Sequence, residues 1–305
     1  MLHAVSALLS AQMLRHLEQL QLIARRRARA GLKGERRSRA RGQSVEFADH
    51  RNYASGDDLR YLDWNLYGRL DRLFLRLYEE ERELPVTLFL DASESMSFGE
   101  PRKFDVALQL AAAAGYVALC GFDRVQVMLM PQRLDVSAEE RASIQALRLV
   151  RGKASAISYL KHLSALKAGG ACRLNEGLKQ ASAQSSLGGL AVVLSDFLDP
   201  EGYEEGLMAL LSRGFEVAAI QILSPQELSP NHFGDLQLVD SETGETREVT
   251  FSRQRLEAYR SAVRRYVEQL KGFCSAHGVS FAQCASDTPL ERLFLEQLRE
   301  AEVWR

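Results

Sequence analysis

The sequence predicts an α/β protein with a mostly parallel, Rossmann-like sheet that helices cover on both faces. Two observations support this fold class. Apolar strands and helices alternate from Pro85 to the end of the 305-residue chain, which is the pattern of a parallel sheet with crossover helices. The loops after two of the strands are rich in Ser and Asp, and the ligand sites of open α/β sheets lie at the carboxyl ends of strands.

Each element follows from the length and pattern of its apolar residues. Short apolar runs predict strands, and longer periodic segments predict helices. Strands are predicted at 86–90, 124–130, 190–194, 215–223 and 279–284. Helices are predicted at 103–120, 138–167, 174–185, 202–213, 254–277 and 290–301. The segments 235–240 and 246–251 flank a Thr-Gly turn and predict a hairpin, inserted at about 232–252.

Two smaller parts precede the α/β domain, which is expected to span residues 85–305. Residues 1–30 are expected to form an amphipathic helix and a basic arm, because apolar residues recur at mostly three- and four-residue spacing from Val5 to Ile23. Residues 31–84 are expected to form a small β-rich subdomain. They are dense in charged and aromatic residues, and polarity alternates over 72–78.

The charge of the chain is unevenly placed. Between Arg25 and Arg41, nine Lys and Arg side chains are opposed only by Glu35. Such a run can bind phosphates, so nucleic-acid binding is one alternative. No aromatic residues interleave to stack bases, however, and we favour a solvated arm or one that pairs with the acidic run 79–83.

Composition limits the remaining function classes. A net charge of -1, with 46% hydrophobic and 26% charged residues, is typical of a soluble globular protein. Four cysteines without C-x-x-C spacing predict reduced thiols. The most apolar run, 110–120, is shorter than the roughly 20 residues of a membrane span, so we expect a cytoplasmic protein with no membrane partner. The chain lacks the glycine loops that bind ATP or dinucleotides.

Oxygen-bearing side chains follow two of the predicted strands. Asp91, Ser93 and Ser95 stand at alternate positions just after one strand, and Asp196 follows a later strand. At the carboxyl edge of a sheet these groups can converge on a hard cation such as Mg²⁺. The arrangement resembles the metal-ion-dependent adhesion site of von Willebrand factor A-type domains. The resemblance implies that the two serines bind Mg²⁺ directly, that the two aspartates hold its waters, and that a partner's carboxylate completes the site.

The sequence departs from that pattern in one loop. Related A-type domains carry a Gly-Thr-Asp-Leu-like loop whose threonine joins the metal, whereas Cys172 and Arg173 stand at the matching positions here. A thiol is a soft ligand that suits Mg²⁺ poorly, and an adjacent arginine repels the ion. Metal binding is therefore expected to be weakened or lost, with Arg173 neutralising Asp91 and Asp196 instead. The cofactor is either none or a weakly held Mg²⁺.

A second block of residues narrows the resemblance to one bacterial family. This block precedes the strand that ends at Asp91. It contains, in order, the motifs Glu-Phe, Arg-x-Tyr, Gly-Asp-Asp-x-Arg and Asp-Trp. The matching residues are Arg51, Tyr53, Asp57, Asp58, Arg60, Asp63, Trp64 and Arg69. Over residues 30–303 the chain resembles the family known as domain of unknown function 58. We expect the eight residues to form a buried structural network, because no nucleophile and base can be assembled from them.

The resemblance implies that such proteins work beside MoxR-type AAA+ ATPases in chaperone-like or complex-maturation roles. We therefore expect a non-enzymatic interaction module whose partner is a protein. One alternative is a hydrolase in which a divalent metal at the Asp91, Ser93 and Ser95 site activates water, with Glu94 or Asp199 as the base. The other alternative is nucleic-acid binding through the basic arm.

Overall fold

The structure is a computed structural model. It describes residues 8–18, 45–80, 85–130, 149–170, 173–184, 188–230, 234–239 and 246–297. The chain divides into two compact units. Leu32–Glu83 form a small unit, and Met1–Gly31 together with Leu84–Arg305 form a large unit.

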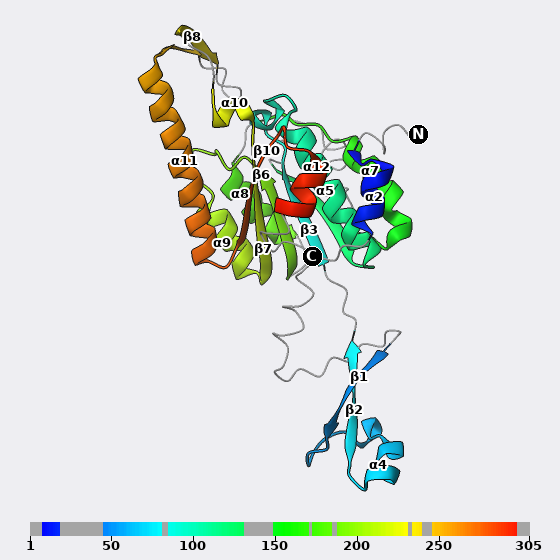
Figure 1. The fold of residues 1–305 in the computed structure, drawn as a ribbon. Helices are drawn as coiled ribbons and strands as arrows, with labels where there is room; N and C mark the ends of the chain where they lie inside the picture. Colours follow the sequence, from blue (N-terminus) through cyan, green and yellow to red (C-terminus); the bar gives the residue numbers. More distant parts are fainter. Residues whose placement is uncertain are drawn as a thin grey trace. The chain divides into compact units, whose positions relative to one another are not determined.

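A six-stranded sheet forms the centre of the large unit, with the strand order β10-β7-β6-β3-β4-β5 (Figure 1). The strands are β3 (Pro85–Asp91), β4 (Arg124–Met130), β5 (Val150–Arg151), β6 (Gly189–Ser195), β7 (Phe215–Leu223) and β10 (Ser280–Ala285). All neighbouring pairs are parallel except β4 and β5. The predicted α/β class with a mostly parallel sheet is therefore confirmed.

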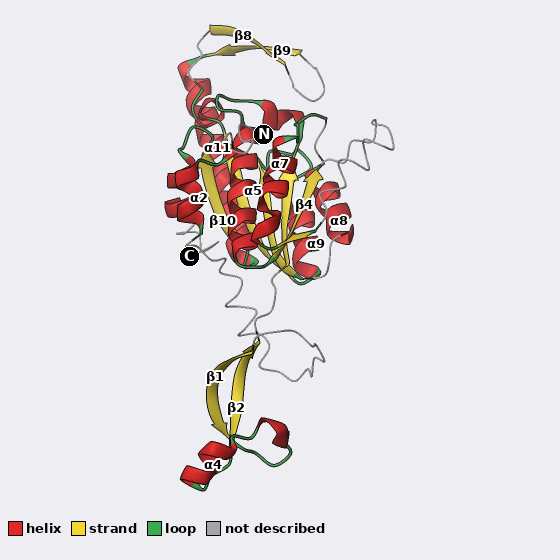
Figure 2. Cartoon of the chain, turned by 90° about the vertical axis from the view of Figure 1, so that its right-hand side faces the viewer, coloured by secondary structure: helices red, strands yellow, loops and turns green. Residues whose placement is uncertain are grey.

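Helices cover both faces of this sheet (Figures 1 and 2). They are α2 (Ala11–Leu17), α5 (Lys103–Cys120), α7 (Ala156–Ser164), α8 (Leu174–Gln184), α9 (Glu204–Ser212), α10 (Pro225–Leu228), α11 (Arg253–Ala276) and α12 (Leu290–Arg292). The helices α2, α5 and α7 lie on one side, and α8, α9 and α11 lie on the other. The strands β8 (Gly234–Val239) and β9 (Thr246–Phe251) pair as an antiparallel hairpin, where the sequence predicts one.

The central strand β3 is buried on both sides. Leu88 and Leu90 pack into the cluster under α5, whereas Phe89 packs with Phe215 in the opposite cluster. Successive strand residues point to opposite faces, so a strand that is covered twice is apolar throughout. The helix α5 is also buried along nearly its whole length. By length and composition it is the one helix in the described ranges that could cross a membrane, and its side chains fill the core of the sheet.

The two strands that neighbour β3 are reached by connections that run in opposite directions along the sheet. It passes from β3 through α5 to β4 on one side, and later returns to β6 on the other side. Parallel pairing places Leu90 of β3 beside Leu194 of β6. The carboxyl ends of these two strands therefore meet where the strand order reverses, which is where open α/β sheets form ligand sites.

Two predicted helices differ from the structure. The sequence predicts helical segments over about 138–167, and in the described part of that range α7 begins only at Ala156, after the short strand β5. Residues 138–148 of this prediction lie outside the described residues. The strand forms because it can pair with the edge of β4, and Gly152, at φ +72°, then redirects the chain. At the other end of the unit, α12 ends at Arg292 and a π-helical turn follows to Gln297, so the predicted helix over 290–301 is irregular.

The small unit is an antiparallel strand pair with one short helix. Its elements are β1 (Val45–Asn52), a 3₁₀ turn (Leu59–Tyr61), α4 (Trp64–Leu70) and β2 (Phe74–Glu80). Strand β2 agrees with the alternating polarity, but the sequence analysis does not predict α4. Its start is explained by Asp63, whose Oδ1 accepts hydrogen bonds from the backbone N–H groups of Asn65 and Leu66 at 3.0 and 3.1 Å.

The close packing of α5 against α7 can be tested at Gly115. A Cβ atom there would overlap the ring and hydroxyl of the buried Tyr159, which donates a 2.6 Å hydrogen bond to the carbonyl of Ala111. We expect Gly115→Ala to lower the free energy of unfolding by about 1–3 kcal/mol, measured by urea denaturation, because the ring must move. The matched control is Gly272→Ala in α11, where the added methyl group meets nothing within 4 Å. It should stabilise the fold by roughly 0.5–1 kcal/mol, and equal effects of the two substitutions would contradict the packing.

Candidate functional site

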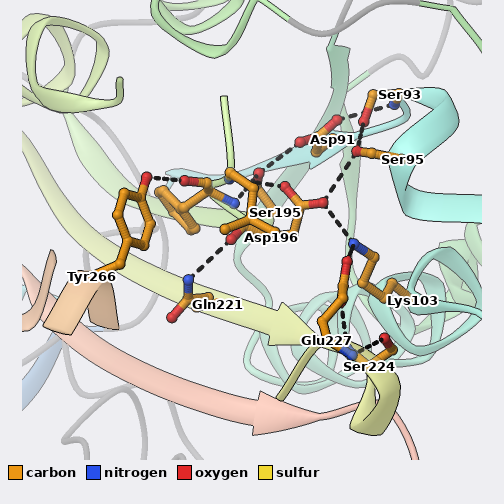
Figure 3. Close-up of polar contacts among 12 residues, drawn as sticks. Asp91, Ser93, Ser95, Lys103, Ser195, Asp196, Gln221, Ser224, Glu227 and Tyr266 are labelled. Carbon is orange, nitrogen blue, oxygen red and sulfur yellow. Dashed lines mark hydrogen bonds and ion pairs between the residues drawn. The ribbon is translucent and has the colours of Figure 1, made fainter. Parts of the chain in front are cut away.

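The carboxyl ends of β3 and β6 bring together the four predicted metal-site residues Asp91, Ser93, Ser95 and Asp196 (Figure 3). Asp91 is the last residue of β3, Ser93 and Ser95 follow it, and Asp196 comes directly after β6. Among these four residues, the two aspartates and Ser93 are almost fully buried. The convergence expected from the sequence is therefore present in the structure.

Asp91 is held by hydrogen bonds from both strands. Its Oδ1 accepts from the backbone N–H of Ser93 at 3.0 Å, and its Oδ2 accepts from the hydroxyl of Ser195 at 2.6 Å. Burial raises the pKa of the Asp91 carboxyl to about 6, and the nearby charge of Asp196 raises it further, against the lowering effect of the two serines. The prediction did not include Ser195 as a site residue, although it stands directly before Asp196 at the end of a buried strand.

The two serines of the loop link Asp91 to Asp196. The hydroxyls of Ser93 and Ser95 are 2.9 Å apart and share a hydrogen bond, and the hydroxyl of Ser95 donates to Oδ2 of Asp196 at 3.1 Å. Ser93 precedes a 3₁₀ turn (Glu94–Ser97), but its side chain makes no capping hydrogen bond there. These hydroxyls therefore belong to the polar site and do not cap the turn that follows.

Lys103, which the sequence analysis did not identify, supplies the positive charge of the site. Its ammonium lies 2.7 Å from Oδ2 of Asp196 and 2.5 Å from Oε1 of Glu227, and the side chain has 0% exposure (Figure 3). Burial alone lowers the pKa of Lys103, but the charges of Asp196 and Glu227 outweigh it, so that the pKa is raised overall. A lysine at the first residue of a helix opposes the helix dipole, and this unfavourable position was the signal in the sequence.

Glu227 reaches the ammonium from a short, well-capped helix. The hydroxyl of Ser224 accepts from the backbone N–H of Glu227 at 3.2 Å, and Oε2 of Glu227 accepts from the backbone N–H of Ser224 at 2.7 Å. This reciprocal pair is a capping box. The box holds one carboxylate oxygen of Glu227, and the other is directed at Lys103.

The expected role of Arg173 is wrong. Its guanidinium is exposed and lies 3.5 Å from Glu176, one turn along α8. It is the ammonium of Lys103 that contacts Asp196, because α5 starts beside the end of β6 and buries its first residue there. Cys172, the other half of the predicted departure, lies outside the described residues.

The donor set does not fit the Mg²⁺ ion that the resemblance implies. The hydroxyls of Ser93 and Ser95 bond to each other, and Oδ2 of Asp196 is occupied by an ammonium that repels a divalent cation. Within the described ranges, no three His, Cys, Asp or Glu side chains form a group that could hold a metal. The positive charge of the site is instead supplied by the chain itself, through the ammonium of Lys103.

The backbone after β6 is held in an uncommon conformation. Phe197 has φ +57°, a left-handed value that non-glycine residues seldom adopt. Its N–H donates to the hydroxyl of Ser195 at 2.9 Å, and its carbonyl accepts a hydrogen bond from the hydroxyl of Tyr266. The amide of Gln221 donates to the carbonyl of Asp196 at 3.0 Å. A strained backbone that several hydrogen bonds hold in place is typical of functional loops.

The predicted network of the small unit is only partly buried. Asp63 is 7% exposed and lies 3.0 Å from Nε2 of His50, but the Arg60–Asp58 ion pair is largely exposed and Trp64 is 63% exposed. Asp63 accepts hydrogen bonds from backbone N–H groups, and Asp58 accepts both from the backbone N–H of Arg60, at 3.0 Å, and from its guanidinium. The expectation of one buried network is therefore wrong. Several of these side chains are exposed, and the aspartates accept hydrogen bonds from neighbouring residues in the same short turns.

Asp57 is a further local acceptor in the same loop, since its Oδ2 accepts from the backbone N–H of Ala54 at 2.8 Å. The backbone N–H of Tyr53 donates to the carbonyl of Leu73 and so continues the β1–β2 pairing. Arg69 lies in the last turn of α4, where its charge favours the helix dipole. The side chain of Arg51 lies outside the described parts of the chain.

The internal ammonium makes a prediction about magnesium. In chelator-treated protein, adding Mg²⁺ should leave the melting temperature unchanged, because a ligand stabilises only by binding the folded state. In a Lys103→Met/Glu227→Gln variant, which removes the ammonium and one buried charge, Mg²⁺ should raise the melting temperature by about 2–4 °C at tenfold excess over its Kd. Adding Asp91→Asn should abolish that response. A magnesium-dependent rise in the unmodified protein would show that the ammonium does not replace the metal.

The raised pKa of Asp91 predicts a pH dependence of stability. Its carboxyl binds a proton more tightly in the folded chain than at its ordinary pKa of 3.8. Its contribution to stability is therefore complete below about pH 4 and is lost as the pH rises through about 6. Relative to Asp91→Asn, whose neutral amide has the same shape, the free energy of unfolding should fall by about 2–3 kcal/mol between pH 4 and pH 7.5. Urea unfolding at several pH values measures this, and parallel profiles would refute the raised pKa.

Comparison with curated proteins finds relatives in mycobacteria. An uncharacterized protein of Mycobacterium tuberculosis is 28% identical over 236 residues, which cover 77% of this chain and 72% of that protein. An uncharacterized protein of Mycobacterium bovis matches with the same identity and coverage. A third, from Mycobacterium avium, is 44% identical over 66 residues, or 22% of this chain and 38% of that protein. None of these names states a function.

Two solved structures are also similar. The conserved hypothetical protein BatB from Bacteroides thetaiotaomicron has 13% identity and a TM-score of 0.39, covering 72% of this chain and 98% of that chain. An aerotolerance-related membrane protein from Bacteroides fragilis has 16% identity and a TM-score of 0.40, covering 71% and 99%. At these levels, neither structure identifies the function of this chain.

A family model gives a direct assignment. The model described as "Protein of unknown function DUF58" matches residues 49–269. This range is well over half of the chain, and it contains most of the small unit and all the site residues described above. The protein therefore belongs to the DUF58 family.

Proposed function

We propose that this protein is a non-enzymatic interaction module with a von Willebrand A-type core, and that it works with a MoxR-type AAA+ ATPase in chaperone-like or complex-maturation work. The partner docks on the carboxyl edge of the sheet, around Asp91 and Asp196. The setting that we propose is the cytoplasm. Docking does not require Mg²⁺, because Lys103 supplies the cation within the chain.

The observation that carries the proposal is a closed polar site with an apolar rim. The hydroxyls and carboxylates of the site bond to one another and to Lys103. The loops that carry them also expose two large apolar side chains, Phe98 at 51% and Leu198 at 43%. Exposed apolar residues around a rigid polar centre suit the docking of a protein surface.

The same geometry weakens the hydrolase alternative. Asp199, one of the two proposed bases, accepts a backbone hydrogen bond at each of its carboxylate oxygens. Its Oδ2 accepts from the backbone N–H of Leu174 at 2.6 Å and its Oδ1 from that of Glu201 at 2.8 Å. A general base needs a free lone pair within reach of the water that it activates. In the described part of the chain, the hydroxyls of Ser93 and Ser95 bond to each other and to a carboxylate of the site.

The nucleic-acid alternative rests on the basic run between Arg25 and Arg41, which lies outside the described residues. No feature of the described carboxyl edge favours it, because the acidic groups of that edge repel phosphates. We therefore retain the protein-partner proposal alone.

The proposal predicts that the apolar rim contributes to binding. A co-encoded MoxR-type ATPase should co-purify with the chain both in Mg²⁺ and in chelator. Phe98→Ser and Leu198→Ser should each weaken the complex by about tenfold, as expected for central apolar contacts. Isothermal titration or biolayer interferometry gives the Kd.

The matched control is Ile157→Ser on α7. This residue is more exposed than either rim residue, at 73%, and lies near β5 and the amino ends of the strands. Its replacement should leave the Kd unchanged, and all three variants should keep the melting temperature. If no complex forms with or without Mg²⁺, the proposed partner is wrong. If Ile157→Ser weakens binding as much as Phe98→Ser, the partner does not dock at the carboxyl edge.

A further inference from the structure

An open cavity of about 560 Å³ lies beside the site, between the loop after β6 and the helix α11. Its lining includes Leu198, Asp199, Tyr203, Glu204, Tyr266 and Phe273. Leu198 also belongs to the apolar rim, so the cavity is continuous with the proposed docking edge. Tyr266 links it to the site directly, because its hydroxyl holds the carbonyl of Phe197 (Figure 3).

Three aromatic rings form one wall of the cavity. The ring of Tyr203 is 6.2 Å from that of Tyr266 and 5.6 Å from that of Phe273, and both pairs meet edge to face. Tyr203 is 4% exposed. Its hydroxyl has no hydrogen-bond partner in any of the segments that the structure describes. The ring is buried but its hydroxyl is not fully buried, so on the wall of the open cavity the hydroxyl is available to a ligand.

The other walls carry negative charge. Asp199 and Glu204 line the cavity, and no Lys, Arg or His residue does so among its described lining. The loop 196–205 contains five acidic residues and no basic residue. Two lysines that pair with acidic residues of this region do not line the cavity. Lys103 binds Asp196 and Glu227, and Lys179 binds Glu205.

The pKa values of two tyrosines reflect their burial and, after it, the same negative charges. Burial raises the pKa of Tyr203 to about 12, with a further contribution from the charge of Glu204. Burial likewise raises the pKa of Tyr266, followed by the effects of Tyr203, Glu204 and the two aspartates 196 and 199. Both phenols therefore stay neutral, and the field around them disfavours anions.

We propose that this cavity binds the cationic side chain of a lysine or arginine from the partner protein. The aromatic rings would contact the cation through their faces, and the carboxylates of Asp199 and Glu204 would provide its counter-charge. The inference rests on the proposed function, because it takes the partner to be a protein that docks at this edge. It also states what that partner must contribute, which is a basic residue next to an apolar patch.

Other ligand classes fit the cavity less well. An anion would face two carboxylates without a basic residue on the described wall. A metal ion would need several free oxygen or nitrogen ligands, whereas Asp199 already accepts two backbone hydrogen bonds and Glu204 accepts one from the N–H of Tyr203 at 3.0 Å. A wholly apolar side chain would leave the hydroxyl of Tyr203 and the carboxylates buried beneath it.

The first test uses small probes on the full chain. N-acetyl-lysine methylamide and N-acetyl-arginine methylamide are titrated while chemical shifts are followed by NMR, with N-acetyl-norleucine methylamide as the neutral probe of similar length. We expect saturable binding of the cationic probes at about 1–10 mM and at least threefold weaker binding of the neutral probe. Equal binding of all three probes, or no binding of the cationic ones, would overturn the inference.

The second test uses variants and a matched control. Glu204→Gln and Phe273→Leu should each weaken binding of the cationic probes at least threefold. Glu205→Gln should have no effect, because this neighbouring carboxylate does not line the cavity and binds Lys179 instead. Melting curves confirm that each variant is folded. If Glu205→Gln weakens binding as much as Glu204→Gln, only the general acidity of the loop is involved and the cavity is not the site.

Complex formation separates this inference from the proposed function. If the ATPase complex forms and its Kd is unchanged by Glu204→Gln and Phe273→Leu, the cavity inference fails and the proposed function stands. If the cationic probes bind as expected but no complex forms with the ATPase, the proposed partner fails and the cavity stands as a site for a cation. If the cationic probes and the ATPase both bind, and the two variants weaken both interactions in parallel, the inference is supported.

Discussion

The buried ion cluster of Lys103, Asp196 and Glu227 is the interaction on which the arrangement of the carboxyl edge depends. It joins the first residue of α5, the end of β6 and the short helix α10. Removing three charges from water is unfavourable by several kcal/mol per ion, and only close geometry with further hydrogen bonds offsets this. Here the capping box of Glu227 and the hydroxyl of Ser95 supply those bonds. The three elements cannot separate without leaving a charge buried and unpaired.

This cluster also determines the chemistry of the edge. A cation that belongs to the chain cannot be exchanged, so the site offers no open coordination position to a ligand. The groups that remain accessible are the apolar rim and the aromatic, acidic cavity beside it. We propose that this edge recognises shape and positive charge, whereas a metal-bearing edge recognises a negatively charged ligand.

The regular part of the fold could be predicted from the sequence because its patterns are local. The predicted bounds of α5, β4 and β7 agree with the structure, since each is a mainly apolar segment with a length and pattern typical of its element. The convergence of Asp91 and Asp196 also followed from strand order. The unfavourable position of Lys103 at the start of its helix is a local signal, but nothing local indicates its pairing with Glu227, which lies 124 residues further along the chain. Arg173 is nearer than Lys103 to Asp196 in the sequence, but it lies directly before α8, one turn from Glu176.

The short strand β5 has a consequence for how copies of this chain can associate. An open strand of a sheet is a template for pairing with another chain. Among the described residues, β5 places two residues in antiparallel register beside β4, and Arg124 and Arg151 stand directly opposite each other there. A short strand with arginines at its border discourages the sheet from extending into a neighbouring molecule, and so disfavours aggregation along that side.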